Sequence, residues 1–465
     1  MLKFYFMKKK NNEPTYGIEE TITPIDGRNK HKLQSLAPYF SDFALNKHRV
    51  LVELKYLLAL SKHKVIRKFT PSELVLIHRL INTFSRKDYF EIREIEKETN
   101  HDMKAVEEYI KEKLKKTSLK DVREMVHFGL TSDDTNNIAY ALIIRDSLAK
   151  VIFPEIEEIL EVVKDSAKRY KKIAMLGRTH GQTAAPTTLG KEYFVYYKRL
   201  KLEIEKLRNL EMKAKLTGNV GNLNAHKFVY PKINWLKFSE DFISSFGLTP
   251  ELITTQILPY DSLIAIFNKL ITINNILLGL CKDFWMYIML GYFKQKVVKK
   301  EVGSTALPHK VNPIYFEGAE GGFDVANAFL EMYCRKLPYS RLQRDLSDST
   351  VKRSFGTALS YCLLSYQSVN VALKRVEPHA EKLHQDLDSH WEVLSEAIQN
   401  TLRTKGYNDA YEKTKQFFRG KNRNKNEIKI FIETLKLKKS DKKKLLNLSP
   451  ENYTGYAGEL VEKYE

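Results

Sequence analysis

Apolar residues recur at helical spacing along most of this chain. The pattern predicts helices over 39–58 and 71–81. Longer helical patterns cover 139–170, 189–216 and 260–300, and the last would span roughly 60 Å at the rise of an α-helix. Few runs alternate in the manner of strands. We therefore predict an all-α fold organised around a bundle of long helices.

Polar breaks between these helices hold candidate chemistry. In the first, Asn100-His101-Asp102, either Asn100 or Asp102 is a plausible helix N-cap, but capping gives no role to His101. The second, 130–137, puts hydroxyl and amide groups at the head of the next helix, where exposed backbone N–H groups favour an anion. A third break, 176–188, places Arg, His and Gln between small residues. This predicts a loop that a ligand or another chain can approach closely.

The segment 303–313 has the composition of a mobile catalytic loop. Gly303 supplies backbone freedom, and Pro308 and Pro313 stop the chain from continuing as a helix. Two hydroxyls, a His, a Lys and an Asn fall within this segment. Taken alone, it leaves open the alternative of a polar connector without function.

The composition of the chain narrows the classes of function. It has 465 residues, 43% of them hydrophobic, enough for a large core and two or three domains. A formal net charge of +20 would suit nucleic acid, an acidic membrane surface or an anionic substrate. Lysines are scattered through the polar segments and no nucleic-acid-binding motif occurs, so we expect a solvated surface and no nucleic acid partner. The three cysteines lack metal-ligand spacing, which suits a reducing compartment and predicts neither disulfides nor a zinc site.

Two apolar stretches bear on localisation. The run 1–7 is shorter than a signal-peptide core and precedes the lysines at 8–10, the reverse of the usual order. The run 263–290 is interrupted by Asn, Lys and Asp side chains, which favours a buried helix of a bundle over a membrane span. We therefore expect a cytoplasmic protein with no membrane partner.

Several motifs occur in a fixed order along nearly the whole chain. They are Asp26-Gly27-Arg28, Thr99-Asn100-His101-Asp102, Thr131-Ser132, Arg178-Thr179-His180-Gly181-Gln182, Lys191-Glu192, Gly221-Asn222-Leu223-Asn224-Ala225-His226, Thr254-Thr255-Gln256, the segment 303–313, Gln343-Arg344-Asp345-Leu346 and Asp348-Ser349-Thr350-Val351-Lys352-Arg353. Together they resemble the fumarase/aspartase superfamily, and most closely its branch that acts on adenylosuccinate. The shared order is far more specific than any single motif.

The resemblance implies an all-α fold of three domains, which we place at 1–120, 121–370 and 371–465. The middle domain would be a long-helix bundle that assembles a homotetramer. In this superfamily each active site takes residues from three subunits, which would explain why the candidate residues lie in widely separated segments.

The resemblance also implies a β-elimination that releases fumarate. Adenylosuccinate would give AMP, and SAICAR, a succinylated carboxamide ribotide of purine synthesis, would give AICAR. The reaction needs a base for a weakly acidic proton next to a carboxylate and an acid for the departing nitrogen. By resemblance Ser304 is the base, His180 is the acid and His101 is a second histidine at the substrate. Lys310, with Asn312, would hold the carboxylate that becomes an aci-anion.

Other residues are expected to bind the substrate, and no metal or organic cofactor is required. Cations and hydroxyls would hold the phosphate, and neighbouring polar groups the succinyl carboxylates. The full set expected to bind substrate is Arg28, Asn29, Asn100, Asp102, Thr131, Ser132, Gln256, Asn312, Arg344, Ser349 and Arg353. Thr305, Asn29 and Gly318 depart from the commoner family residues at their positions, which affects substrate contacts and not the reaction class.

Three other functions compete with this interpretation. Another fumarate-releasing lyase, such as argininosuccinate lyase or fumarase, fits less well because His309 and the 344–353 stretch suit a phosphate-bearing substrate. A basic nucleic-acid-binding helical protein is the second alternative. A catalytically silent relative is the third, and the intact Ser304, His180 and Lys310 argue against it.

Overall fold

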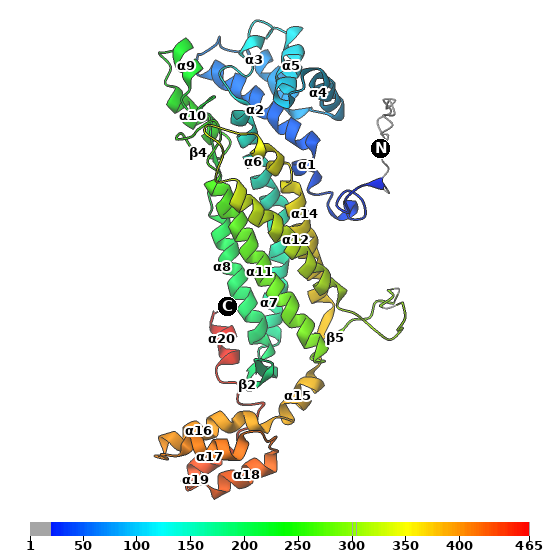
Figure 1. Cartoon of the computed structure of the whole chain (residues 1–465), viewed down its shortest axis with the longest axis vertical. Helices are drawn as coiled ribbons and strands as arrows, with labels where there is room; N and C mark the ends of the chain where they lie inside the picture. Colours follow the sequence, from blue (N-terminus) through cyan, green and yellow to red (C-terminus); the bar gives the residue numbers. More distant parts are fainter. Residues whose placement is uncertain (1–19, 300, 304, 465) are drawn as a thin grey trace, which may run out of the picture. The chain divides into compact units, whose positions relative to one another are not determined.

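The computed structural model describes residues 20–299, 301–303 and 305–464 (Figure 1). The chain divides into two compact units. Unit 1 comprises Met1–Ile152, Glu211–Ile264 and Met332–Leu364, and unit 2 comprises Phe153–Leu210, Ala265–Glu331 and Ser365–Glu465. Each unit is therefore assembled from separate stretches of chain. The predicted three-domain division stays a prediction.

Unit 1 is helical and includes one parallel pair of two-residue strands. Its elements are α1 (Ala37–Phe40), α2 (Asp42–Lys62), α3 (Pro71–Asn82), α4 (Arg86–Thr99), α5 (Asp102–Lys115), α6 (Ser132–Ser147), β3 (Lys213–Ala214), α9 (Asn224–Val229), α10 (Trp235–Ser244), β4 (Thr249–Pro250), α13 (Ser347–Lys352) and the first half of α14 (Phe355–Lys374). Val50, Leu54 and Leu57 recur at helical spacing on α2 and are fully buried in one core with Ile77 and Ile110. This core holds α5 and α6, whose N-termini carry candidate site residues.

Unit 2 contains most of α11 and α12, the two longest helices of the described residues, and the C-terminal helices. Its elements are α7 (Phe153–Arg169), β1 (Ala174–Thr179), β2 (Gln182–Thr188), α8 (Leu189–Arg208), α11 (Asp261–Met289, whose first turn belongs to unit 1), β5 (Phe293–Gln295), α12 (Ile314–Lys336, whose last turn belongs to unit 1), the second half of α14, β6 (Val376–Pro378), α15 (Ala380–Asp388), α16 (Ser395–Thr404), α17 (Ala410–Phe418), α18 (Lys425–Thr434), α19 (Lys439–Leu446) and α20 (Ala457–Tyr464). Lys269 of α11 pairs with Glu203 of α8 at 2.7 Å, so these helices lie side by side, as Figure 1 shows. The all-α, long-helix prediction is confirmed.

The apolar helix α11 behaves as a bundle helix. It is the one helix in the described part of the chain that is long and apolar enough to cross a membrane, yet half of its most apolar stretch is buried inside the chain. Its buried Asn274 donates to Asn327 Oδ1 of α12 at 2.9 Å and accepts from the Tyr366 hydroxyl of α14 at 2.6 Å. Polar pairs of this kind satisfy a buried amide between packed helices, as expected for a bundle.

Three sequence predictions are wrong in form. The helix predicted over 189–216 ends at Arg208, and Lys213–Ala214 form the strand β3, which pairs with β4. The segment 176–188 is not a loop but part of an antiparallel hairpin of β1 and β2, closed by His180 and Gly181 at φ +52° and +73°. Positive φ at both central residues is what a two-residue hairpin turn of type I′ requires. The helix predicted over 260–300 ends at Met289, because Gly291 adopts φ +76° and the following residues form β5, which pairs with β6.

Candidate active site

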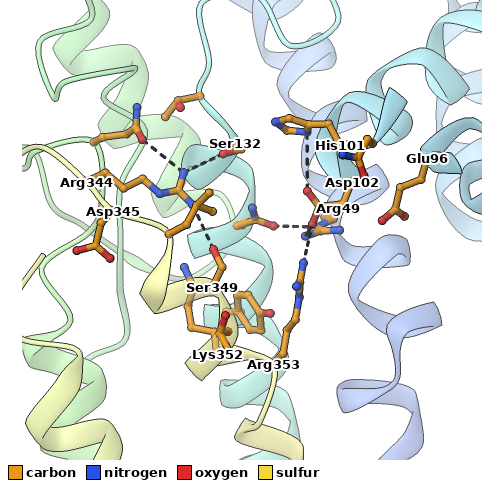
Figure 2. A pocket seen from close by; sticks show the side chains of 17 residues that line it. Arg49, Glu96, His101, Asp102, Ser132, Arg344, Asp345, Ser349, Lys352 and Arg353 are labelled. Atoms are coloured by element: carbon orange, nitrogen blue, oxygen red, sulfur yellow. Dashed lines mark hydrogen bonds and ion pairs between the residues drawn. The ribbon is translucent and has the colours of Figure 1, made fainter. Parts of the chain in front are cut away.

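A cavity of about 740 Å³ in unit 1 gathers many of the predicted site residues (Figure 2). They come from the α4–α5 junction, the N-terminus of α6, the segment before α11, and α13 with the turn before it. The predicted residues that line this cavity are Asn100, His101, Asp102, Thr131, Ser132, Gln256, Arg344, Ser349 and Arg353. The fold therefore brings together four segments that are far apart in sequence.

The α4–α5 junction places His101 at the cavity. Asn100 ends α4 in the left-handed conformation, with φ +50°. The predicted cap, Asn100 or Asp102, is wrong: His101 is the N-cap of α5, and its Nδ1 accepts from the backbone N–H of Lys104 at 3.2 Å. Capping uses one ring nitrogen, and 56% of the side chain remains exposed. The other ring nitrogen, Nε2, therefore takes no part in the capping hydrogen bond.

Asp102 is shared between two arginines. Arg49 Nη2 donates to Asp102 Oδ2 at 2.6 Å, and Arg353 Nη2 approaches the same oxygen at 3.4 Å. Burial acts to raise the pKa of Asp102, but the Arg49 guanidinium and its hydrogen bond hold that pKa below its ordinary value. Arg49 also donates from Nε to Asn136 Oδ1 at 2.8 Å. The carboxylate thus orients two cations at the cavity wall.

The N-terminus of α6 is fixed by a capping box. Thr131 is the N-cap, and its backbone N–H donates to Asp134 Oδ2 at 2.9 Å. Asp134 is itself buried and accepts from the Lys215 ammonium at 2.8 Å. Ser132, the first residue of α6, therefore enters the cavity from a rigid helix end.

Arg344 is the cation best placed to bind an anion. Its Nη1 donates to Ser132 Oγ at 3.0 Å and Gln256 Oε1 at 3.4 Å, and its Nη2 to Ser349 Oγ at 3.3 Å. All three acceptors are neutral. Its closest carboxylate contact, Asp348 Oδ1, lies 4.0 Å from Nε. Because no carboxylate is hydrogen-bonded to this guanidinium, its positive charge is available to an anionic ligand. Its planar arrangement of N–H donors suits phosphate or carboxylate.

The Arg49–Asp102 pair predicts a pH-dependent contribution to stability. Asp102→Asn is expected to lower the free energy of unfolding by about 1.5 kcal/mol at pH 7, because a charge-assisted hydrogen bond becomes a neutral one. A lowered pKa in the folded state means that this contribution is present above the unfolded pKa, near 4, and is lost as pH falls through the lower folded value. Chemical denaturation of both proteins between pH 3 and pH 7 measures it. A difference that persists undiminished at the lowest pH would contradict the assignment.

Other predicted residues lie outside this cavity. Arg28 lines a separate hollow of about 790 Å³ in unit 1, and Asn29 precedes a short 3₁₀ helix, Lys30–Lys32. In unit 2, His180 is exposed at the tip of the β1–β2 hairpin. The hairpin is anchored by Arg178, whose Nη2 donates to Asp386 Oδ2 of α15 at 2.9 Å.

The 303–313 loop is also in unit 2, and Ser304 lies outside the described residues. Asn312 Nδ2 donates to the carbonyl of Gly303 at 2.9 Å, which ties the two ends of the loop together. A Cβ on Gly303 would lie 2.1 Å from the carbonyl oxygen of Lys310, so only glycine fits there. Lys310 is exposed.

Sequence reasoning missed several residues of the cavity wall. Arg49 and Lys352 are buried cations, and Asn136, Tyr140 and Glu96 also line the cavity. A basic residue in a helix has the same local pattern whether it is buried or solvated. The one local signal is weak: Arg49 interrupts an apolar helical face. Across the described ranges, no group of three or more His, Cys, Asp or Glu side chains is arranged as a metal site.

Comparison with known proteins identifies the family. Residues 36–324 match the family model described as lyase, and residues 340–454 match the one described as adenylosuccinate lyase C-terminal. The adenylosuccinate lyase of Legionella pneumophila strain Corby is 43% identical over 447 residues, which cover 95% of this chain and 98% of that protein. The adenylosuccinate lyase of Escherichia coli K12 is 40% identical over 446 residues, again 95% and 98% of the two chains.

Solved structures show the same fold at much lower identity. A fumarate lyase from Mesorhizobium sp. BNC1 superimposes with a TM-score of 0.74 at 18% identity, over 92% of this chain and 96% of the other. The 3-carboxy-cis,cis-muconate lactonizing enzyme from Pseudomonas putida gives a TM-score of 0.75 at 18% identity over the same shares. Fold and family model together define a lyase. Within that class, the chain belongs to the adenylosuccinate lyase family, which confirms the resemblance seen in the motifs.

Proposed function

We propose that this enzyme eliminates fumarate from adenylosuccinate to give AMP, and from SAICAR to give AICAR. The observation that carries the proposal is the unit 1 cavity, where Arg344 is held by neutral hydroxyl and amide groups among the predicted substrate residues. Both substrates combine a phosphate with two succinyl carboxylates. Guanidinium, hydroxyl and amide donors converging on one cavity suit such a polyanion.

Phosphate recognition would use α13 and the turn before it. Arg344, Ser349 and Arg353 present two guanidinium groups and a hydroxyl from one short stretch, and all three line the cavity. Arg353 is largely exposed and its bond to Asp102 is long, so it is free to turn toward a ligand. Thr131, Ser132 and Gln256 on the facing segments would receive the succinyl carboxylates.

The chemical step would come from groups on the other unit. Ser304 would take the proton from the carbon next to a succinyl carboxylate, and the electron pair would move into that carboxylate as an aci-anion held by Lys310 and Asn312. Collapse of the aci-anion forms the double bond of fumarate and breaks the C–N bond, while His180 gives its proton to the departing nitrogen. The atoms and electrons of this elimination balance without water, a metal ion or a redox partner.

We further propose that these groups meet across subunits of a homotetramer. Large apolar side chains are exposed along α8, α11 and α12 of unit 2, and only half of the most apolar stretch of α11 is buried within one chain. An exposed apolar face of this kind is typical of an oligomer interface. The exposed residues are Val195, Leu202, Trp285, Met286, Met289 and Val325. Purine nucleotide synthesis would place the tetramer in the cytoplasm.

Subunit complementation tests the shared site. His180→Ala is expected to be nearly inactive, and Arg344→Met nearly inactive at substrate concentrations close to the parental KM, at which the mixing is assayed. If the two residues of one site come from different subunits, mixing the variants under conditions that exchange subunits should restore about one quarter of the parental activity, because random mixing gives that share of intact sites. Fumarate release before and after mixing measures the gain. A tetramer that shows no gain would contradict the shared site, as would a monomer in sedimentation analysis.

A substrate panel tests the reaction itself. Fumarate release is expected from adenylosuccinate and SAICAR, and not from argininosuccinate or malate, because only the first two carry the phosphate that the Arg344 cluster would bind. Turnover of argininosuccinate or malate in preference to adenylosuccinate would contradict the proposed substrate class.

A further inference from the structure

Lys352 is a buried lysine beneath the cavity wall, and the proposed function gives it no role. Its side chain is 2% exposed, yet the residue lines the cavity (Figure 2). Its ammonium contacts Asp348 Oδ2 at 2.7 Å, Tyr260 Oη at 2.7 Å and Asp133 Oδ1 at 3.2 Å. An ammonium has three N–H donors, so all three are used by these partners.

The three partners belong to three segments that line the cavity, here called its walls. They are the N-terminus of α6, the segment 256–260 before α11, and α13. Asp133 directly follows Ser132 at the N-terminus of α6, and Asp348 directly precedes Ser349 on α13. Tyr260 ends the segment that carries Gln256. In each wall, the residue that contacts the Lys352 ammonium is therefore at most four positions in sequence from a residue expected to bind substrate.

A second bond reinforces this junction. The backbone N–H of Leu258 donates to Asp133 Oδ2 at 3.3 Å, so the Asp133 carboxylate bridges Lys352 and the segment that carries Gln256. Tyr260 Oη in turn donates to Asp348 Oδ2 at 3.2 Å. The cluster is thus closed: each wall is bonded to the other two through groups that water does not reach.

We propose that Lys352 is the positioning residue of the cavity: its ammonium locks the α6, Gln256 and α13 walls into the spacing that binds the nucleotide substrate. This inference rests on the proposed function for the identity of that ligand. Lys352 does not touch the substrate, because its donors are already satisfied. It acts through Ser132, Gln256 and Ser349, which its three partners hold in place.

The charge of Lys352 is essential to this role. Asp133 and Asp348 are both buried, and Lys352 is the one cation in the described part of the chain within hydrogen-bond distance of either carboxylate. Burial acts to lower the pKa of Lys352, but Asp133, Tyr260 and Asp348 together hold that pKa well above its ordinary value. The lysine is therefore charged at neutral pH, and removing it would leave two buried carboxylates facing each other.

Lys352→Met tests the proposal, because methionine keeps most of the volume and removes the charge. We expect the KM for adenylosuccinate and the dissociation constant for AMP to rise together by about 10- to 100-fold, with a smaller change in kcat, because two buried carboxylates that have lost the ammonium between them repel each other and push the walls apart. In the double variant Lys352→Met/Asp133→Asn one of those charges is gone, and most of the lost affinity should return. Steady-state kinetics and calorimetry with AMP provide the two readouts.

Matched variants separate this role from its alternatives. Lys213→Met removes a lysine from the partly exposed pair with Glu251 in the same unit and should leave KM and AMP affinity unchanged. Unchanged AMP affinity in Lys352→Met would overturn the proposal. A double variant no better than the single would also overturn it, because a lysine that bound the ligand directly could not be compensated by Asp133→Asn.

AMP binding also decides the proposal if Lys352→Met does not fold or if the parent protein is inactive. If Lys352→Met does not fold, Tyr260→Phe removes one hydroxyl of the cluster and should still weaken AMP binding several-fold; unchanged binding there would overturn the inference. If the parent protein binds AMP but releases no fumarate from either substrate, the proposed function fails. The positioning role of Lys352 is then decided by AMP affinity alone.

Discussion

Replacing Ser304 by alanine is expected to lower kcat for adenylosuccinate by about 10⁴-fold with little change in KM. The hydroxyl is the proposed base for carbon deprotonation, and loss of a general base or nucleophilic oxygen removes an interaction made only in the transition state. The ends of the loop that carries it are held by the Asn312–Gly303 hydrogen bond, and alanine at 304 leaves both residues in place. Ultraviolet absorbance at substrate concentrations spanning KM measures both constants.

The neighbouring hydroxyl provides the matched control. Thr305→Ala removes an oxygen from the adjacent position of the same loop and should keep kcat within about tenfold of the parent, because it is not the base. A Ser304→Ala variant with unchanged turnover would remove Ser304 from the mechanism. If Thr305→Ala were the inactive variant instead, the base would have to be reassigned to the threonine hydroxyl.

Replacing Arg344 by methionine is expected to raise the KM for adenylosuccinate by about 100-fold, the loss of one or two charge-assisted hydrogen bonds. Arg344 is the cavity cation held by three neutral acceptors, so no protein carboxylate neutralises it at hydrogen-bond distance. Arg344→Lys should be intermediate, because the charge remains but the planar fork is lost. The same kinetic titration, with calorimetry for AMP, measures the change.

Arg341→Met is the control for Arg344→Met. Arg341 lies three residues earlier in the same turn, its side chain is 86% exposed, and its guanidinium lies 3.8 Å from Asp345 Oδ2. The backbone N–H of Arg341 also donates to Asp345 Oδ2 at 3.0 Å, a bond that the substitution keeps. Surface pairs of this kind contribute little, so KM and AMP affinity should be unchanged. Equal effects of the two substitutions would mean that the net charge of the turn, and not the Arg344 geometry, controls binding.

The helices could be predicted from the sequence because the patterns that indicate them are local. Apolar residues at helical spacing in α2 form the core of unit 1, and Thr131 with Asp134 makes the capping box that begins α6. The β1–β2 hairpin could not be predicted from the sequence. Its segment consists of small and polar residues without alternation, and the hairpin is held by contacts such as Arg178 with Asp386, about two hundred residues away in the chain.

The motifs named nine of the residues that line the cavity, but they did not predict the geometry that brings these residues together. Nothing local in the sequence indicates that Ser132, Gln256 and Arg344 share one cavity. Asp133, Tyr260 and Lys352 bond these segments to one another, and their sequence patterns are those of ordinary helix and loop residues. His101 shows the same limit: its motif was recognised, but its capping of α5 was assigned to its neighbours because histidine is an uncommon N-cap.

The most direct test of the account is whether the purified protein converts adenylosuccinate into equal amounts of AMP and fumarate. Absorbance would follow the reaction and chromatography would identify both products, with His180→Ala and Ser304→Ala measured beside the parent. We predict stoichiometric products from the parent and loss of turnover in both variants. A folded, tetrameric parent that releases neither product would contradict the assignment of this reaction to the protein.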